Sequence, residues 1–344
     1  MKNMSLKYRA SDSRIFSFLI ILLIYILAFF AGFYTFKFLN SSGFHFLLSF
    51  FIADVSATIL VWLSGIILKN SSVYDPYWSV APFVIIFSWI ILRNTGFVLT
   101  DVLLLAAVFF WGTRLTLNWA IKWQGMAHQD WRYSMLRKKS PKMWLLTNLV
   151  GINLVPTIVV YLALVPAYFT VIFNSPAMQS RVNTAYGFYS LNPVIISGFI
   201  ICIASAVIQA VSDRQMDRFR KINKTGSSPQ VYNGEKPSIN NISLNSNSRQ
   251  GHIDEGLWRY SRHPNYFSEV LFWWGIWVIQ IGAVDLKNTG SWIWWTIAGP
   301  VFMTLLFLFI SIPMMEKYLI SKRPSYIEYK SKVSMLIPWF RVRQ

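Results

Sequence analysis

The sequence predicts an all-α fold, a polytopic transmembrane helix bundle with about six to eight spans. Composition is the first reason, because 54% of the 344 residues are hydrophobic and only 13% are charged, against about 25% charged residues in an ordinary soluble domain. Apolar runs close to the roughly 20 residues that a helix needs to cross the hydrocarbon core also recur along the chain. One aqueous core of this length could not bury so much apolar surface, so lipid is the expected solvent.

Eight apolar runs are candidate spans. The first is longer than the roughly 7–15 residues of the apolar region in a secretory signal, so it is interpreted as a membrane helix. The third and seventh have the weakest signal, and a re-entrant third and fourth pair would leave six crossings with the same sidedness. The runs are 15–36, 44–68, 78–92, 97–121, 144–172, 191–212, 266–284 and 291–315.

The basic residues are expected almost entirely on one side of the membrane. With the N-terminus inside and eight crossings, 27 of the 32 Lys and Arg residues fall in inside segments. The positive-inside rule predicts this asymmetry, so both termini are expected on the cytosolic side. In a soluble protein a formal net charge of +18 would suggest nucleic acid; here it is assigned to topology, and no nucleic-acid partner is expected.

The expected organisation follows from these runs. Asn and Ser dominate residues 222–251, a composition that cannot bury enough apolar surface to order itself, so a mobile loop is predicted there. Cys202 is the one cysteine, which excludes an internal disulfide, and no metal site is expected. The parts are a basic cytosolic N-terminus (1–14), N-terminal transmembrane helices (15–121), a cytosolic loop (122–143) and a C-terminal transmembrane region (144–344).

Such a chain is expected to be a multi-pass integral membrane protein. Its membrane would be the endoplasmic reticulum in a eukaryote and the inner membrane in a bacterium. Ionisable groups are costly within lipid, so those in or beside the spans are the first candidates for function.

One polar cluster directly continues the sixth span. If the helix runs on into water, Asp213, Asp217, Arg220 and Lys221 share one face with Gln209. Taken alone, this pattern favours a solvated helix end with ion pairs one turn apart over a binding site.

A second cluster, at residues 256–269, precedes and begins the seventh run. Arg259 and Arg262 flank a helix N-terminus, where free N–H groups and guanidinium groups together favour phosphate oxygens. Interfacial anchoring explains the arginines and aromatic residues. It does not explain Asn265 and Glu269, which lie one turn apart and are carried inward.

Three isolated polar residues complete this survey. Glu316 ends the last apolar run. The enrichment of aromatic residues at membrane interfaces does not explain a glutamate at this position. Asp54 and His45 are lone polar residues in the second span, and pairing within the bundle is expected for both.

In order, these motifs resemble the uncharacterised integral-membrane branch of the steroid 5-alpha-reductase-like family. The resemblance covers roughly residues 70–340, and the match at 256–269 is the most specific. The motifs are Trp-Gly-x-Arg-Leu (111–115), Asp-Trp-Arg-Tyr (130–133), Asp-Arg-Gln-x-x-x-Phe-Arg (213–220), Gly-Leu-Trp-Arg-Tyr-Ser-Arg-His-Pro-Asn-Tyr-Phe-x-Glu (256–269), Glu316, Tyr329 and Ile337-Pro338-Trp339-Phe340.

This resemblance implies NADPH-dependent reduction of a conjugated carbon–carbon double bond in a sterol-like, steroid or other lipid, with the cofactor bound from the cytosolic side. Two departures argue against steroid specificity: Ile312 stands where the steroid reductases have a basic residue, and their N-terminal Gln-Glu pair has no counterpart. The positions carried over as cofactor-pocket residues are Asp213, Arg220, Asn265, Glu269 and Glu316, with Arg259, Tyr260, Arg262 and His263 around the same pocket.

Reduction of such a bond also needs an acid near the developing enolate. A tyrosine backed by a carboxylate is a suitable donor. The catalytic candidates are Tyr133 with Asp130, or alternatively Tyr74 with Asp75.

Two other functions remain open. The isoprenylcysteine and phospholipid methyltransferases also place an Arg-His-Pro-x-Tyr motif before a hydrophobic helix pair, and they would bind S-adenosylmethionine. The basic residues at 214–221 and 259–262 favour a phosphate-bearing cofactor instead. The second alternative is a non-catalytic lipid-binding membrane protein.

Overall fold

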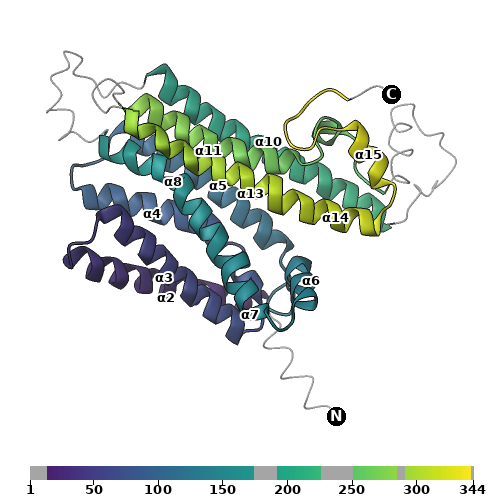
Figure 1. The fold of residues 1–344 in the computed structure, drawn as a ribbon, viewed down its shortest axis with the longest axis horizontal. Helices are drawn as coiled ribbons and strands as arrows, with labels where there is room; N and C mark the ends of the chain where they lie inside the picture. The colour runs from purple at the N-terminus through teal and green to yellow at the C-terminus, as the bar shows by residue number, and fades with distance from the viewer. Residues whose placement is uncertain (1–13, 174–191, 226–250, 285–290, 342–344) are drawn as a thin grey trace, which may run out of the picture. The chain divides into compact units, whose positions relative to one another are not determined.

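The computed structural model describes residues 14–173, 192–225, 251–284 and 291–341 (Figure 1). Of these described residues 82% are helical, and no strand is assigned within these ranges, where an isolated bridge joins Ser261 and Ser334. The all-α prediction is therefore confirmed. Most of the predicted basic N-terminus and most of the predicted Asn- and Ser-rich loop lie outside the described residues.

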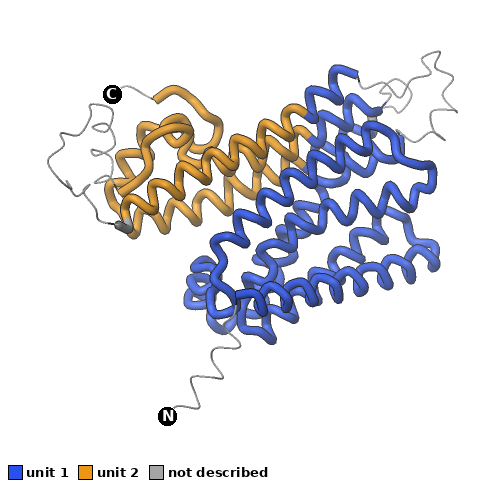
Figure 2. The backbone as a smooth tube through the Cα atoms, turned by 180° about the vertical axis from the view of Figure 1, so that it is seen from behind, with its two compact units in different colours: residues 1–199, 276–299 blue, residues 200–275, 300–344 orange. Residues whose placement is uncertain are grey.

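Two compact units divide the chain (Figure 2). Unit 1 comprises residues 1–199 and 276–299, and unit 2 comprises residues 200–275 and 300–344. Helices α10 (Pro193–Thr225), α11 (Pro264–Ala283) and α13 (Ala298–Leu306) each continue from one unit into the other.

The remaining elements fall within one unit each. Unit 1 contains α2 (Arg14–Ser41), α3 (Phe46–Ile67), η1 (Ser71–Tyr74), α4 (Tyr77–Arg93), α5 (Leu99–Lys122), α6 (Trp131–Lys139), α7 (Trp144–Leu146), the π-helix η2 (Thr147–Leu154), α8 (Val155–Phe173) and η6 (Ser291–Ile297). Unit 2 contains η5 (Gly256–Arg259), the π-helix η7 (Phe307–Ser311), α14 (Ile312–Lys322) and α15 (Tyr326–Lys332).

Within the described part of the chain, seven helical segments are long and apolar enough to cross a membrane. The seventh predicted span corresponds to α11, a helix of 20 residues that is not among them, because Glu269, Gln280 and its tryptophans lower its hydropathy. The protein is therefore a multi-pass membrane protein. The seven segments are Arg14–Ser41, Phe46–Ile67, Ser71–Arg93, Leu99–Lys122, Trp144–Phe173, Pro193–Asn223 and Ile293–Lys322.

Small residues allow the helices of unit 1 to approach closely. A Cβ atom added at Gly32 of α2 would lie 3.3 Å from the carbonyl oxygen of Ala53 in α3. A Cβ atom at Gly112 of α5 would clash with the carbonyl oxygen of Ser79 in α4. Close backbone packing of this kind stabilises helix pairs in lipid, where hydrophobic association is weak.

Two boundaries follow the sequence, and two differ from it. Helix α10 continues past Asp213, as predicted, but it also includes residues 222–225 of the predicted loop. Pro264 begins α11 as expected for a first-turn proline. The predicted loop 122–143 contains α6, because Asp130 caps that helix by accepting a hydrogen bond from the Arg132 N–H at 2.8 Å.

Candidate functional site

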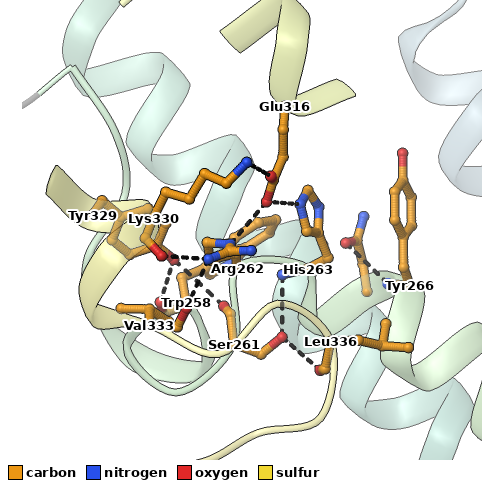
Figure 3. A network of polar contacts seen from close by, with 11 residues as sticks. Trp258, Ser261, Arg262, His263, Tyr266, Glu316, Tyr329, Lys330, Val333 and Leu336 are labelled. Atoms are coloured by element: carbon orange, nitrogen blue, oxygen red, sulfur yellow. Dashed lines mark hydrogen bonds and ion pairs between the residues drawn. The ribbon is translucent and has the colours of Figure 1, made fainter. Parts of the chain in front are cut away.

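A buried carboxylate in unit 2 gathers three basic side chains. Glu316 of α14 is 4% exposed. Its Oε1 lies 2.8 Å from Arg262 Nε and 3.2 Å from His263 Nε2, and its Oε2 lies 2.8 Å from Lys330 Nζ (Figure 3). We refer to Arg262, His263, Glu316 and Lys330 as the Glu316 cluster.

The segment after α15 fixes Arg262 through the backbone. The Arg262 N–H donates to the Ser334 carbonyl at 2.8 Å, and its Nη1 donates to the Val333 carbonyl at 3.0 Å and to the Lys330 carbonyl. All of these acceptors belong to α15 or follow it. The guanidinium is therefore committed to Glu316 and to carbonyl groups, which makes Arg262 a positioning residue.

Ser261 connects the same segment to His263. Its hydroxyl donates to the Leu336 carbonyl at 2.7 Å and accepts from the His263 N–H at 3.1 Å (Figure 3). The imidazole ring stacks on Tyr266, with 5.3 Å between the ring centroids. These contacts hold His263 at the start of α11, facing Glu316.

Helix α10 supports the cluster through η5. Trp258 Nε1 donates to the Ser212 carbonyl at 3.1 Å, and the Leu257 N–H donates to Gln215 Oε1 at 3.0 Å. Gly256 has φ +59°, and a Cβ atom there would clash with the Gln215 side chain. Only glycine satisfies both conditions at this position, so the tight turn before the cluster depends on it.

The cluster carries net positive charge. Burial disfavours the charged imidazole and lowers the pKa of His263 from 6.5, although Glu316 raises it in part. A neutral His263 leaves Arg262 and Lys330 with two positive charges against the single negative charge of Glu316. The net charge of +1 (2 − 1) suits an anionic ligand.

A pocket of about 340 Å³ opens beside this charge. Its volume lies at the lower end of the roughly 300–1,000 Å³ typical of ligand pockets. Lys317 adds a third cationic side chain, while the rest of the wall is apolar. The lining residues are Ile312, Pro313, Glu316, Lys317, Ile320, Lys330 and Met335.

Glu269, a predicted cofactor residue, belongs to a different buried group. Its Oε2 accepts from Gln209 Nε2 at 2.9 Å and its Oε1 accepts from Trp273 Nε1 at 3.1 Å. Asn265, one turn earlier, is half-buried and accepts from the Tyr266 N–H at 3.1 Å. These hydrogen bonds connect the polar pair to α10 and to α11 itself.

The other predicted cofactor residues lie at the surface of unit 2. Arg259 and Tyr260 are exposed at the end of η5, and Arg220 is exposed on α10. Asp213 is half-buried on the same helix. The structure therefore brings together Arg262, His263 and Glu316 from the predicted set, and Lys330 is the member that the sequence did not reveal.

In unit 1, the two predicted tyrosine and carboxylate pairings are wrong. The Tyr133 hydroxyl donates to Asp75 Oδ1, which takes one residue from each predicted pair. Asp130 is occupied by capping α6 and by Arg132, at 2.9 Å from Nε. Tyr74 turns away from Asp75 and shares a hydrogen bond of 2.8 Å with Thr157.

The phenol of Tyr133 is strongly held in its protonated form. Burial raises its pKa well above 10, and the negative charge of Asp75 raises it further. The side chain is 7% exposed. The phenol therefore stays protonated at neutral pH, and Asp75 fixes the orientation of its hydroxyl.

A second pair of this kind lies deeper in unit 1. Tyr77 donates to Asp54 Oδ1 at 2.8 Å, which confirms that Asp54 is paired within the bundle. Beside them, Thr58 and Thr157 share a hydrogen bond of 3.0 Å between α3 and α8. The intramembrane position of Asp54 is the signal that could have found this pair.

The π-helix η2 adds a third polar group to this unit. Asn148 Nδ2 donates to Ser71 Oγ at 2.8 Å, and Asn153 Nδ2 donates to the Asn148 carbonyl at 2.8 Å. π-Helical turns are rare, and many of those that occur lie at functional sites. Among the described residues, no group of three or more His, Cys, Asp and Glu side chains is arranged to hold a metal ion.

Comparison with known proteins places these sites in a family. A family model described as "Protein of unknown function (DUF1295)" matches residues 61–333, most of the chain. The chain belongs to the DUF1295 family. This family falls within the steroid 5-alpha-reductase-like group, and the matched region contains every residue of the Glu316 cluster as well as Tyr133 and Asp75.

One curated relative of this DUF1295 protein is an uncharacterised protein of Schizosaccharomyces pombe. The two are 26% identical over 302 residues, which cover 85% of this chain and 78% of the relative. No solved structure matches the chain significantly.

Proposed function

We propose that this DUF1295 protein is an integral membrane oxidoreductase that uses NADPH to reduce a conjugated carbon–carbon double bond in a sterol-like or other lipid. The observation that carries the proposal is the cationic pocket at the end of the last span, where Lys317 and Lys330 flank the buried Glu316. The reaction class comes from the similarity to the steroid 5-alpha-reductase-like group.

The residues of the pocket fit an anionic cofactor. NADPH carries a pyrophosphate and a 2′-phosphate, and lysine ammonium groups are common partners of phosphate oxygens. Lys330 is 44% exposed and Lys317 is also exposed, so both can reach a phosphate group. S-adenosylmethionine has a positive sulfonium and no phosphate, so the same two lysines disfavour it.

The bound cofactor would supply hydride to the β-carbon of a conjugated substrate. In this proposal Lys317 and Lys330 hold its phosphate groups, and Glu316 and Arg262 fix the position of Lys330. The apolar side chains of Ile312 and Ile320 exclude water from the inner wall of the pocket.

The chain itself must provide the proton for the α-carbon side of the reaction. We assign this role to Tyr133, whose phenol is protonated at neutral pH and whose hydroxyl is oriented by Asp75. A positioned acid of this kind typically contributes about 10²–10⁴-fold to a rate. Tyr77, oriented by Asp54, is the second candidate for the same role.

Thermal unfolding of the purified protein with each cofactor tests the proposal. We expect NADPH to raise the unfolding temperature and S-adenosylmethionine to leave it unchanged, because a ligand stabilises only the state that binds it. The Lys330→Gln variant should lose most of the NADPH effect. Lys332→Gln is the matched control, since Lys332 pairs with Glu328 and lies outside the pocket.

Two outcomes would overturn this reading. Stabilisation by S-adenosylmethionine alone would favour the methyltransferase. Stabilisation by neither compound, together with unchanged cellular lipids on deletion, would favour a non-catalytic lipid-binding protein.

A further inference from the structure

The segment that closes the Glu316 cluster has a second, outward face. Residues 333–341, which we call the C-terminal strap, follow α15 (Figure 1). Its inward bonds run from Arg262 N–H to the Ser334 carbonyl, from Ser261 Oγ to the Leu336 carbonyl, and from the Trp339 N–H to the Tyr260 carbonyl at 2.9 Å. The strap is thus tied along its length to the turn that precedes α11.

The outward face of the strap is apolar and exposed. Ile337 is 63% exposed, Trp339 is 68% exposed and Phe340 is 79% exposed. Tyr260, 41% exposed, lies edge-on to Phe340 with 6.4 Å between ring centroids. By contrast, Val333 and Leu336 of the same strap are buried, so the strap presents its apolar residues on two sides.

Contacts within unit 2 connect the strap to the points where the apolar runs of two spanning helices end. The turn beneath it is anchored to α10 by Trp258, which bonds the carbonyl of Ser212. Ser212 is the last residue before the charged sequence that begins at Asp213. On the last span, the same turn meets Glu316, where the apolar run ends.

Basic residues are frequent in the sequence around the exposed face. Between residues 316 and 341 there are six Lys and Arg residues and two Glu residues. Arg341 forms an ion pair with Asp254, and Arg259 is exposed beside Tyr260. Exposed aromatic side chains flanked by basic groups, at the level where a span ends, suit the headgroup region of an anionic bilayer.

We propose that the C-terminal strap docks on the membrane that the protein spans, with Ile337, Trp339 and Phe340 inserted among the headgroups of an anionic leaflet. Insertion removes these side chains from water and continues the lipid-facing surface of α14 beyond the end of the span. Because the strap accepts the bonds that fix Arg262 and Ser261, docking also stabilises the Glu316 cluster. Anionic lipid therefore supports the geometry of the pocket.

A single fluorescent label tests the docking directly. Cys202 is the one cysteine and is fully buried, so Cys202→Ala gives a background in which one new cysteine can carry an environment-sensitive fluorophore. The test position is Phe340→Cys, and the control is Ser331→Cys, an exposed residue of α15. Both proteins are reconstituted in nanodiscs with and without phosphatidylserine.

The expected result is a blue-shifted emission at position 340, with several-fold stronger quenching by nitroxide-labelled lipid than at position 331. Iodide in the aqueous phase should quench position 331 more strongly, and phosphatidylserine should increase the difference. Equal iodide quenching at both positions would overturn the proposal. Protection of position 340 from both quenchers would also overturn it, because that result indicates a protein partner.

A stability measurement covers the second part of the inference. The double variant Trp339→Ser/Phe340→Ser should unfold at a lower temperature than the wild type in discs with phosphatidylserine, and by less in zwitterionic discs. An equal loss in both kinds of disc would mean that the two side chains act within the protein, which contradicts the docking.

Discussion

Glu316 in unit 2 and Asp75 in unit 1 are carboxylates with different surroundings. In unit 2, Glu316 is enclosed by cationic side chains, chiefly Arg262 and Lys330. In unit 1, Asp75 accepts a hydrogen bond from the Tyr133 phenol. The first arrangement concentrates positive charge at a pocket and suits anion binding, whereas the second holds a neutral proton donor in place. The proposed function accordingly assigns cofactor binding to unit 2 and the proton donor to unit 1.

Glu316→Gln is the variant with the largest expected effect. It leaves the buried Arg262 without its counter-ion, and breaking a buried pair in this way typically costs about 3–5 kcal/mol. Chemical unfolding in detergent should show this loss. The control Glu328→Gln, which removes a glutamate exposed on α15, should leave stability unchanged; equal effects of the two variants would contradict the role assigned to Glu316.

Tyr133→Phe distinguishes proton donation, assigned to unit 1, from cofactor binding, assigned to unit 2. We expect lipid reduction to fall about 100-fold or more, because the proton donor is removed, while NADPH still raises the unfolding temperature as in the wild type. Tyr74→Phe serves as the control, since its hydroxyl bonds Thr157. If Tyr74→Phe abolished reduction and Tyr133→Phe did not, the proton donor would be misassigned.

Gly256→Ala tests the turn that supports the Glu316 cluster. The positive φ and the clash with Gln215 predict a cost of about 1–3 kcal/mol, together with weaker NADPH binding. Gly151→Ala in η2 is the matched substitution in unit 1, because no atom lies within 4 Å of the added Cβ atom. Equal stability of the two variants would show that the turn tolerates a side chain.

The smallest expected effect is on the pH dependence of stability. The pKa of His263 is lowered from 6.5 in the folded protein, so below pH 6.5 the unfolded chain binds more protons than the folded one. The stability due to this group is present above pH 6.5 and is lost as the pH falls, by at most about 1.4 kcal/mol per pH unit.

This slope is measured from unfolding curves of the wild type and of His263→Asn. The curves are recorded between about pH 7 and pH 5, a range that includes the ordinary histidine pKa. The variant should show the flatter dependence. Parallel curves would mean that His263 does not titrate differently in the two states. His252, whose pKa is lowered as well, is present in both proteins, so the difference between the two curves belongs to His263.

The fold was largely predictable because lipid imposes simple requirements on sequence. A span must be long, apolar and helical, so the helices at residues 14–122 match the predicted runs closely. Helix α11 was harder, since Glu269 and Gln280 interrupt its hydropathy while Gln209 and Thr296 donate hydrogen bonds to them within the protein. Hydropathy cannot register a polar side chain that is paired by another helix.

The candidate site was predictable only where its residues are adjacent in the sequence. Arg262 and His263 share one motif, and Glu316 was conspicuous at the end of an apolar run. Lys330 was missed because it reaches Glu316 only after α15 folds back. Tyr133 and Asp75 are 58 positions apart, and their pairing depends on the Asp130 cap of α6, which local spacing did not reveal.

The central claim is that this DUF1295 protein transfers hydride from NADPH to a lipid. The most direct measurement incubates the reconstituted protein with a lipid extract of its source cells and NADPH carrying deuterium at the transferable position of the nicotinamide. Mass spectrometry should find a lipid whose reduced form has gained two hydrogens, one of them deuterium, and Lys330→Gln should lower its yield. Lipids that remain free of deuterium, or that gain a methyl group when S-adenosylmethionine is supplied, would contradict the account.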